Sequence, residues 1–351
     1  MAPTPAPRRA SAADLERFAC ALLDRAGLAA DRAADVASVL VEGDLLGHST
    51  HGLQLLPSYL AEATSGSMAV AGEPAVLADR GASLTWDGQR LPGPWLVLRA
   101  MAEAEARART FGTGTVVIRR SHHIGCLAAY LRRATDRGLL MLLHSSAPSN
   151  ASVVPHGGTR GVLSPSPVSA GFPTEGDPVL LDISTSSTSN GLVARTRAAG
   201  GRLPHPWLAD ADGRASDDPS RTQNILPLGG LDNGHKGFAL ALMVDALTSG
   251  LAGHGRLQPR ANLGASVFLQ ILDPEAFGGL AAFRREMQGV ADACLASPPP
   301  PGGEPVRLPG ARGLRERERQ LAEGVDLLPS IVAALVPWAG KLGVELPADL
   351  R

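Results

Sequence analysis

Two short segments rich in histidine carry the side chains best suited to chemistry. The first is GHSTHG at residues 47–52, and the second is SHHIG at residues 121–125. Each places imidazoles beside hydroxyls and ends in a glycine where the apolar pattern breaks, which predicts a loop that directs side chains outward. Histidine has the side-chain pKa closest to neutrality and is the commonest proton donor or acceptor in catalysis. One such loop is most simply polar surface, but two together predict a site.

The apolar pattern predicts the elements that position these two loops. Helical spacing covers residues 11–27 and 31–43, and the second of these helices leads directly into the first loop. The β-branched run at residues 115–118 predicts a buried strand that leads into the second loop. Helix 126–137 and strand 139–143 follow it. The second loop therefore lies at the carboxyl end of a strand, where open α/β sheets hold ligands.

Two further segments of the middle and late chain have polar side chains that can meet an anion. Residues 184–190 (STSSTSN) follow the short strand at residues 179–183, and their composition favours a flexible linker over a phosphate-binding loop. Lys236 stands among glycines at the predicted entry of helix 238–247, where it meets an approaching anion or is a surface lysine. A strand at residues 267–271 precedes helices that close the chain.

Composition restricts the class of protein. The chain has 351 residues, enough for two subdomains, with 44% hydrophobic and 19% charged residues. A formal net charge of −1 offers no basic field for nucleic acid, and no apolar stretch approaches the ~20 residues of a membrane helix. Three distant cysteines predict a reducing compartment, most simply the cytoplasm. Residues 1–10 are predicted to be a disordered tail.

Common motifs of nucleotide and hydrolase sites are missing. No GxGxxG opens a helix, which excludes an ordinary Rossmann half, and neither GxxxxGK[ST] nor GxSxG occurs. His48 and His51 are three residues apart, but no HExxH or cysteine pair supplies further ligands. A metal enzyme is therefore only a minor alternative, and we predict no metal.

An ordered set of motifs resembles the type-2 malate/L-lactate dehydrogenase family. The resemblance covers nearly the whole chain beyond the N-terminal tail. It implies an NAD- or NADP-dependent oxidoreductase, usually a homodimer with sites near the subunit contacts. The matching segments are residues 47–59, 121–125, 154–158 (VPHGG), 181–186 (LDISTS), 227–230 (PLGG) with Lys236-Gly237, and 308–310 (LPG).

The resemblance also implies a fold and a domain arrangement. The expected class is α/β (α+β), with a non-Rossmann cofactor-binding sheet domain inserted in a discontinuous helical domain made from both chain ends. The sheet domain is expected at residues 81–239. The helical domain, with the substrate site and the dimer contacts, is expected at residues 11–80 and 240–351.

The resemblance assigns roles to individual residues. Hydride transfer to a carbonyl leaves an alkoxide that needs a proton, and His123 matches the acid/base group. Thr50 and His51 match a pair that polarises the substrate oxygen, while Tyr59 and His48 are expected to face the substrate. Residues in seven positions are expected to contact the cofactor, although Asp182 serves equally well as a cap of the following turn: Ser146, Asp182, Ile183, Ser184, Lys236, Pro309 and Gly310.

Two departures from the family pattern bear on the substrate. Leu55 stands where the family commonly has an arginine suited to a substrate carboxylate, and Ser166 replaces the asparagine of a frequent GTNP segment. We expect a small 2-hydroxy or 2-keto acid as the substrate. The alternatives are a reductase of cyclic imine carboxylates and a non-catalytic relative that acts as a binding protein.

Overall fold

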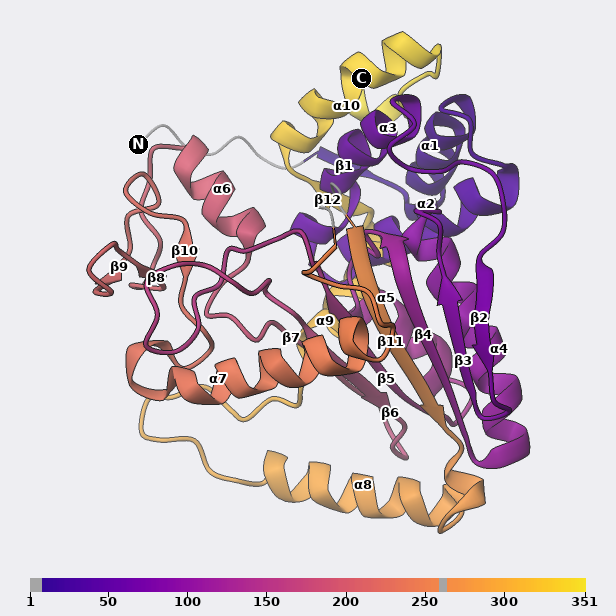
Figure 1. The fold of residues 1–351 in the computed structure, drawn as a ribbon, viewed down its shortest axis with the longest axis vertical. Coiled ribbons are helices and arrows are strands. Elements are labelled where there is room, and N and C mark those ends of the chain that lie inside the picture. Colours follow the sequence, from indigo (N-terminus) through magenta and orange to yellow (C-terminus); the bar gives the residue numbers. More distant parts are fainter. Residues whose placement is uncertain (1–7, 259–263) are drawn as a thin grey trace.

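The computed structural model describes residues 8–258 and 264–351 and shows a mixed sheet flanked by helices (Figure 1). Of the predicted disordered tail, residues 1–7 lie outside these ranges. Residues 8–10 instead form β1 (Arg8–Ala10), which pairs antiparallel with β12 (Val325–Leu327). The prediction is wrong for these three residues because their backbone pairs with β12 near the other end of the chain and Ala10 is buried in the helical core.

Among the residues that the structure describes, seven strands form the central sheet. Their order is β2-β3-β4-β11-β5-β6-β7, and of these neighbours only β3 and β4 run parallel. A mixed, largely antiparallel sheet agrees with the expected non-Rossmann α/β class. The strands are β2 (Ala75–Asp79), β3 (Ser83–Asp87), β4 (Thr113–His122), β5 (Leu140–Ser146), β6 (Val168–Phe172), β7 (Val179–Ile183) and β11 (Gly264–Leu272).

Helices cover the two faces of this sheet unequally. On one face, α4 (Gly93–Phe111) and α5 (Ala128–Thr135) join the alternate apolar residues of β4, β5 and β11 in one core. The opposite face is covered by α7 (Gly230–Asp245) and the π-helical turn Ala246–Gly250. Strands alternate their side chains between faces, so each face receives its own set of apolar residues.

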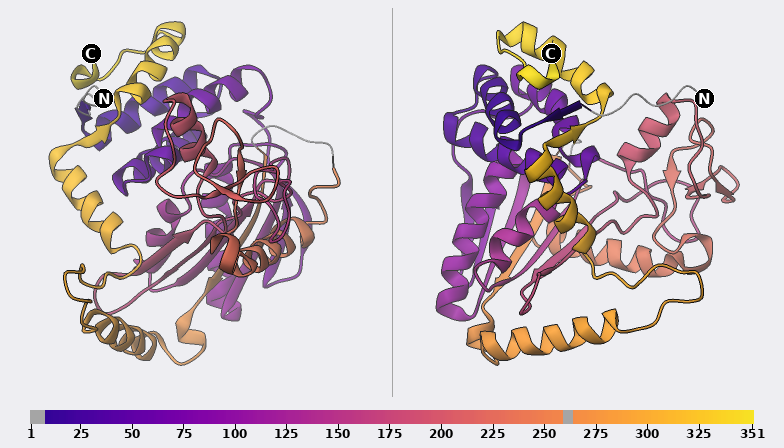
Figure 2. Two further views of the ribbon diagram at one scale, coloured as in Figure 1. Left: turned by 90° about the vertical axis from the view of Figure 1, so that its left-hand side faces the viewer. Right: turned by 180° about the vertical axis from the view of Figure 1, so that it is seen from behind.

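The two chain ends build one helical layer. Helices α1 (Ala12–Arg25), α2 (Ala30–Leu45) and α3 (Leu56–Thr64) share a core with α10 (Pro329–Leu342). Figures 1 and 2 show these indigo and yellow elements side by side at one end of the sheet. This layer holds the first histidine loop against the sheet.

Three further parts surround the sheet. A lobe of α6 (Asn190–Ala198) and short strands β8 (Leu208–Ala209), β9 (Ala215–Ser216) and β10 (Asn224–Ile225) has its own small core. Helix α9 (Ala311–Glu323) packs against α2. Helix α8 (Leu280–Leu295) is mostly exposed and lies along the opposite end of the molecule from α10 (Figure 1).

One expected domain boundary differs from the structure. The strand β11 falls within residues 240–351, which were assigned to the helical domain, yet it lies in the middle of the sheet between β4 and β5. Its apolar residues Val267, Leu269 and Ile271 belong to the sheet's core. Strand pairing is decided by this burial and not by distance along the chain. The division into two domains otherwise stays a prediction.

Candidate active site

A β-bulge sets the direction in which β4 delivers the second histidine loop. Ile118 pairs with Val267 and Ser121 pairs with Ala265, so two residues of β4 oppose one of β11. Within the bulge Arg120 has a φ of 52°, a conformation that non-glycine residues rarely adopt. Arg119 and Arg120 both donate to the buried Asp87. A bulge bends its strand and re-aims the side chains that follow, here the two histidines.

His122 and His123 take different environments around Tyr59, a fully buried residue of α3. The ring of His122 is 0% exposed and meets Tyr59 edge-on, with the ring centroids 4.9 Å apart. The Tyr59 hydroxyl lies 2.9 Å from Nδ1 of His123 and donates to the His123 carbonyl oxygen, also at 2.9 Å. Gly93 packs so closely on this backbone that a Cβ there would lie 2.3 Å from the same carbonyl oxygen. His123 is therefore held tightly in place.

Hydrogen bonding fixes the tautomer of His123. The backbone N–H of Gly125 donates to Nδ1 of His123 at 3.1 Å, so Nδ1 carries no proton and Nε2 does. Burial, together with the neighbouring imidazoles of His51 and His122, lowers the pKa of His123 to about 3. Burial and the charge of Arg90 likewise lower the pKa of His122 to about 3. Both rings are neutral at physiological pH, and His123 can offer an Nε2–H.

The first loop places His51 over His123. The two rings are stacked, with centroids 6.1 Å apart and an interplanar angle of 24°. Nδ1 of His51 lies 2.9 Å from the hydroxyl of Thr50, which can donate or accept. Burial lowers the pKa of His51, while the charge of Asp182 opposes that effect and exposed His48 adds to it. The structure thus brings together His51, His123 and Tyr59 from three elements.

Asp182 joins the site from the end of β7. Its Oδ2 accepts the N–H of Ala128 at 2.9 Å and lies 3.8 Å from Sγ of Cys126. Asp182 therefore caps the start of α5, next to the second histidine loop, and not the turn that follows it in sequence. A carboxylate at a helix N-terminus is favoured by the unpaired N–H groups there.

The hydroxyl-rich segment after β7 is an ordered part of the fold. Thr185, Ser186 and Thr188 are buried. The backbone of this segment pairs with residues 226–228, and the hydroxyls of Ser184 and Thr185 donate to the carbonyl of Pro165. The linker favoured from composition is wrong, because tertiary backbone pairing compensates for the lack of apolar side chains.

Three of the expected cofactor positions border this segment. Gly310 has a φ of 86°, and a Cβ there would lie 2.8 Å from the Leu180 carbonyl oxygen, so only glycine fits. The carbonyl of Pro309 accepts the N–H of Leu180. Ile183, three residues further along β7, is 46% exposed at the end of the strand. The turn at residues 309–310 and the end of β7 thus form one continuous edge.

Lys236 lies within α7 and not at its entry, because α7 begins at Gly230. Its side chain is exposed, whereas the next residue, Gly237, packs against the backbone of Leu228. Leu228 in turn donates its N–H to the carbonyl of Thr185. The close approach of α7 to this backbone places Lys236 near the hydroxyl-rich segment, even though it is not at a helix terminus.

Ser146 is less available than the sequence predicted. It ends β5 and is buried, and its hydroxyl is hydrogen-bonded to Thr248 at 2.7 Å and to Ser249 at 3.1 Å. Its oxygen therefore joins the strand to the π-helical turn. Within residues 8–258 and 264–351, no group of three or more His, Cys, Asp or Glu side chains is arranged to hold a metal ion.

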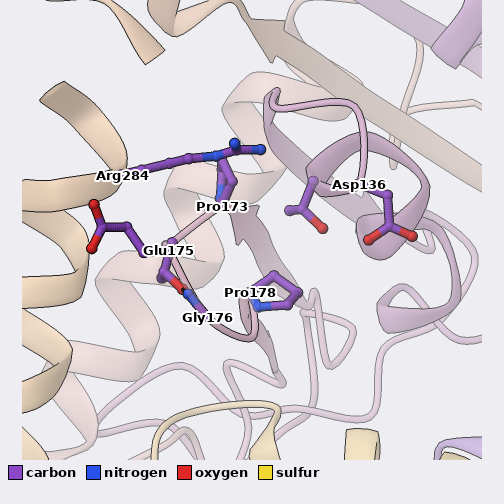
Figure 3. A pocket seen from close by; sticks show the side chains of 8 residues that line it. Asp136, Pro173, Glu175, Gly176, Pro178 and Arg284 are labelled. Atoms are coloured by element: carbon purple, nitrogen blue, oxygen red, sulfur yellow. Dashed lines mark hydrogen bonds between the residues drawn. The ribbon is translucent and has the colours of Figure 1, made fainter. Parts of the chain in front are cut away.

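A cavity elsewhere in the structure is separate from this site. It has a volume of about 210 Å³, and Arg284 extends into it from α8 toward Pro173 (Figure 3). Thr135, the last residue of α5, also lines it, whereas Asp182 binds the first turn of α5. The cavity and the histidines thus lie at opposite ends of that helix.

The residue that sequence reasoning missed is Asp44. It lies in the last turn of α2, is 3% exposed and contacts the first histidine loop. Asp44 is four residues after Leu40, and residues four apart share a helix face. The sequence therefore contained a sign that Asp44 lies on the buried face of this helix. A carboxylate on an apolar helix face is rarely buried without a partner.

Comparisons with known proteins agree with the mixed α/β fold. The family model of malate/L-lactate dehydrogenase matches residues 10–336. A (2R)-3-sulfolactate dehydrogenase (NADP(+)) of Chromohalobacter salexigens is 30% identical over 343 residues, which cover 95% of this chain and 98% of that protein.

Solved structures agree over the same length. The malate dehydrogenase of Pyrococcus horikoshii OT3 superimposes with a TM-score of 0.88 at 26% identity, covering 96% of both chains. The delta1-piperideine-2-carboxylate reductase of Pseudomonas syringae pvar. tomato superimposes with a TM-score of 0.82 at 25% identity, covering 95% of this chain and 100% of that one.

The fold and the matches define an oxidoreductase. The chain belongs to the malate/L-lactate dehydrogenase family, as the ordered motifs predicted. Dehydrogenases of this family use NAD or NADP. None of the helices in the described ranges combines the length and apolar character needed to cross a bilayer.

Proposed function

We propose that this chain is an NAD(P)-dependent dehydrogenase that transfers a hydride between the nicotinamide and a small 2-hydroxy or 2-keto acid. The observation that carries the proposal is the pair of stacked imidazoles, His51 and His123, beside the end of β7. A bound nicotinamide supplies or accepts the hydride. The chain's own residues must then orient the substrate oxygen and move one proton.

The residues at the edge of β7 suit a dinucleotide. Hydroxyls and free backbone groups bind sugars and phosphates, and a lysine binds a phosphate as a point charge. The exposed Ile183, the Ser184 hydroxyl and the glycine turn at Gly310 would lie along the cofactor. Lys236 would meet one of its phosphates, and Asp182 would act through α5 and through His51.

The hydrogen bonds of His51 and His123 favour roles for the two residues that differ from those expected from the sequence. His123 has a permanent donor on Nδ1, the Gly125 N–H, so a second proton on the ring is disfavoured. We infer that His123 donates its Nε2–H to the substrate oxygen, as an oxyanion-type ligand. His51 has a hydroxyl partner that accepts as readily as it donates, and it faces the charge of Asp182. His51 is therefore the better proton carrier.

A panel of substrates tests the proposal. Titration of the protein with NADH and NADPH comes first, followed by turnover of pyruvate, oxaloacetate and 3-sulfopyruvate with the cofactor that binds. We expect turnover of at least one keto acid. Binding of neither cofactor would overturn the proposal, and binding without turnover would favour a binding protein.

Reduction of a cyclic imine carboxylate is the second candidate. The piperideine carboxylate reductase neighbour favours it, since a C=N bond needs the same hydride and one proton. The same panel therefore includes pyrroline-2-carboxylate and piperideine-2-carboxylate. A higher kcat/KM for these imines than for every keto acid would select this candidate.

We also propose a homodimer in the cytoplasm. Support for the dimer comes from apolar residues exposed on α7, including Leu240, Leu242 and Met243, since such a patch usually marks a contact surface. Cys20, Cys126 and Cys294 are all unpaired, as in a reducing compartment. Light scattering should give twice the mass of the chain.

A further inference from the structure

A buried carboxyl group lies directly behind the first histidine loop. The Oδ2 atom of Asp44 accepts the backbone N–H of Leu53 at 2.7 Å. Its Oδ1 atom is buried and has no hydrogen-bond partner among the described residues. Buried polar atoms without a partner are rare and costly in folded proteins. The Leu53 amide that Asp44 holds is two residues after His51 in the chain.

The loop backbone is fitted around this carboxyl group. A Cβ on Gly52 would lie 2.3 Å from the carboxyl carbon of Asp44 and 2.4 Å from each oxygen. A Cβ on Gly43, the preceding residue of α2, would lie 3.2 Å from the carbonyl oxygen of His51. Glycine at position 52 is thus required because the carboxyl occupies the side-chain space. The last turn of α2 lies flush against the backbone of His51.

The other side of Asp44 is fixed by α9. The side-chain amide of Gln320 donates to the carbonyl oxygens of Asp44 at 2.9 Å and of Leu45 at 3.0 Å. Gln320 also accepts the N–H of Asp326 at 2.7 Å. The end of α2 is therefore tied to a rigid neighbour, so the carboxyl of Asp44 is a fixed point to which the loop can be attached.

We propose that Asp44 is a positioning residue, which holds the Leu53 amide and thereby sets the place of His51 over His123. Asp44 does not touch the substrate. That loss of the Asp44 carboxyl lowers turnover rests on the proposed function of His51. That the same loss frees the loop does not depend on the proposed function. Misplacement of a reacting group by about 1 Å can cost on the order of 10²-fold in rate, which gives the scale expected.

The protonation state of Asp44 is compatible with this role on both sides of neutrality. Burial raises the pKa of Asp44 to about 7, and the hydrogen bond from Leu53 opposes that rise. The ionisable groups on the elements packed around it include His48, His51, Cys126 and the Glu42–Arg317 ion pair. On α9 and β12 they also include Glu316, Arg319 and Asp326, which pair with one another. Within the described residues none of them hydrogen-bonds to the carboxyl. The carbonyl oxygen of a neutral acid accepts an N–H as a carboxylate oxygen does.

Three variants of the full chain test the proposal. Asp44→Ala removes the acceptor of the Leu53 N–H, and Asp44→Asn keeps an acceptor of the same shape. Asp35→Ala is the matched control, because Asp35 is a half-buried acid of the same helix that does not contact the loop. Circular dichroism and thermal unfolding first establish that each variant is folded.

The position of the loop is tested by the rate of hydrogen exchange at the Leu53 amide. This measurement does not require that the protein be catalytically active. We expect Asp44→Ala to speed exchange about 10-fold or more, and Asp44→Asn and Asp35→Ala to stay within about 3-fold of the parent. Unchanged exchange in a folded Asp44→Ala protein would overturn the proposal. This readout stands even if no substrate is found, so it separates this proposal from the proposed function.

Turnover is measured next, on the best substrate of the panel. Asp44→Ala should lower kcat by about 10- to 100-fold while leaving the Kd of the cofactor within about 2-fold. If Asp44→Ala loses about 100-fold in kcat, the kcat of Asp44→Asn should be at least about 10-fold higher than that of Asp44→Ala. If Asp44→Asn is folded and as inactive as Asp44→Ala, or if Asp44→Ala keeps the parent kcat, Asp44 does not position His51.

Discussion

The two histidine loops hold their imidazoles by opposite means. The second loop is fixed by neutral groups, namely the Tyr59 hydroxyl and the N–H of Gly125, both within 3.1 Å of Nδ1 of His123. The first loop is fixed by a carboxyl group whose pKa is raised to about 7, and its His51 faces the charge of Asp182. One loop is built to hold a neutral hydrogen-bond donor in place. The other holds a buried acid whose pKa lies near neutrality and a histidine beside a carboxylate.

The largest expected effect separates the two imidazoles by their proton chemistry. A glutamine side chain can donate a hydrogen bond but cannot exchange a proton. His51→Gln should therefore lower kcat by about 10² to 10⁴, the usual contribution of general acid/base catalysis, whereas His123→Gln should lower it by about 10-fold. Steady-state kinetics on the best substrate measures both. A larger loss for His123→Gln would restore the role that the sequence motifs suggested.

The next effect concerns stability against pH and the buried acid of the first loop. The folded-state pKa of Asp44 is raised from 3.8 to about 7, so the folded state holds a proton that the unfolded state has lost. The stabilisation of the folded state by the protonated Asp44 is fully present below about pH 4. It is lost as the pH rises from there through about 7. The loss is at most about 4 kcal/mol, at 1.36 kcal/mol per pH unit.

Urea unfolding of the parent and of Asp44→Asn, at pH 5 and pH 8, measures this contribution. The buried histidines have lowered pKa values and act in the opposite direction, because their stabilisation is lost as the pH falls below about 6.5. The histidines are the same in both proteins, so their contribution cancels when the unfolding free energies of the two are subtracted. We expect the variant to gain stability relative to the parent from pH 5 to pH 8, and no relative gain would contradict the raised pKa.

A smaller effect is expected away from both loops. Lys236→Ala should weaken cofactor binding by about 1.5 to 3 kcal/mol, as for a hydrogen bond to a charged group, and should leave the rate with bound cofactor almost unchanged. Fluorescence titration with NADH and NADPH gives the Kd. Equal affinities of the parent and of a folded variant would show that Lys236 does not bind the cofactor. The proposed site would then consist of the two histidine loops.

The smallest expected effect tests how firmly the second loop is held. Tyr59→Phe removes the hydroxyl that donates to the His123 carbonyl but keeps the ring packed against His122. We expect a loss of about 0.5 to 1.5 kcal/mol in unfolding free energy and about a 10-fold lower kcat. A change in KM with an unaltered kcat would instead indicate that Tyr59 contacts the substrate.

Much of the local structure was predictable. The N-cap Ser11 starts α1, as its hydrogen bond to the Asp14 N–H shows, and the strand before His122 lies where the β-branched run predicted it. These features depend on neighbours in sequence. The glycines before residue 238 predict a loop, so the predicted helix begins eight residues after the true start of α7 at Gly230. They are there so that α7 can pack against residues 227–228.

The parts of the site that escaped prediction depend on contacts between distant segments. The tautomer of His123 is set by a backbone N–H, and no side-chain type in the sequence reports which N–H that will be. The composition of the hydroxyl-rich segment predicts a linker, and its order comes from backbone pairing with residues 226–228. Asp182 caps α5, more than fifty residues earlier in the chain. Pairwise contacts of this kind are decided by packing.

The sequence by itself determined the kinds of groups available to this protein: two histidine loops, a lysine between glycines and an ordered set of motifs typical of one family. It also determined most helices and strands, because periodic burial and capping are local properties. Only the tertiary structure decided that β11 lies at the centre of the sheet, that His51 is stacked over His123, and that a buried Asp44 holds the first loop. The physical reason is that the pKa of a group and the direction in which it points depend on what surrounds it in space.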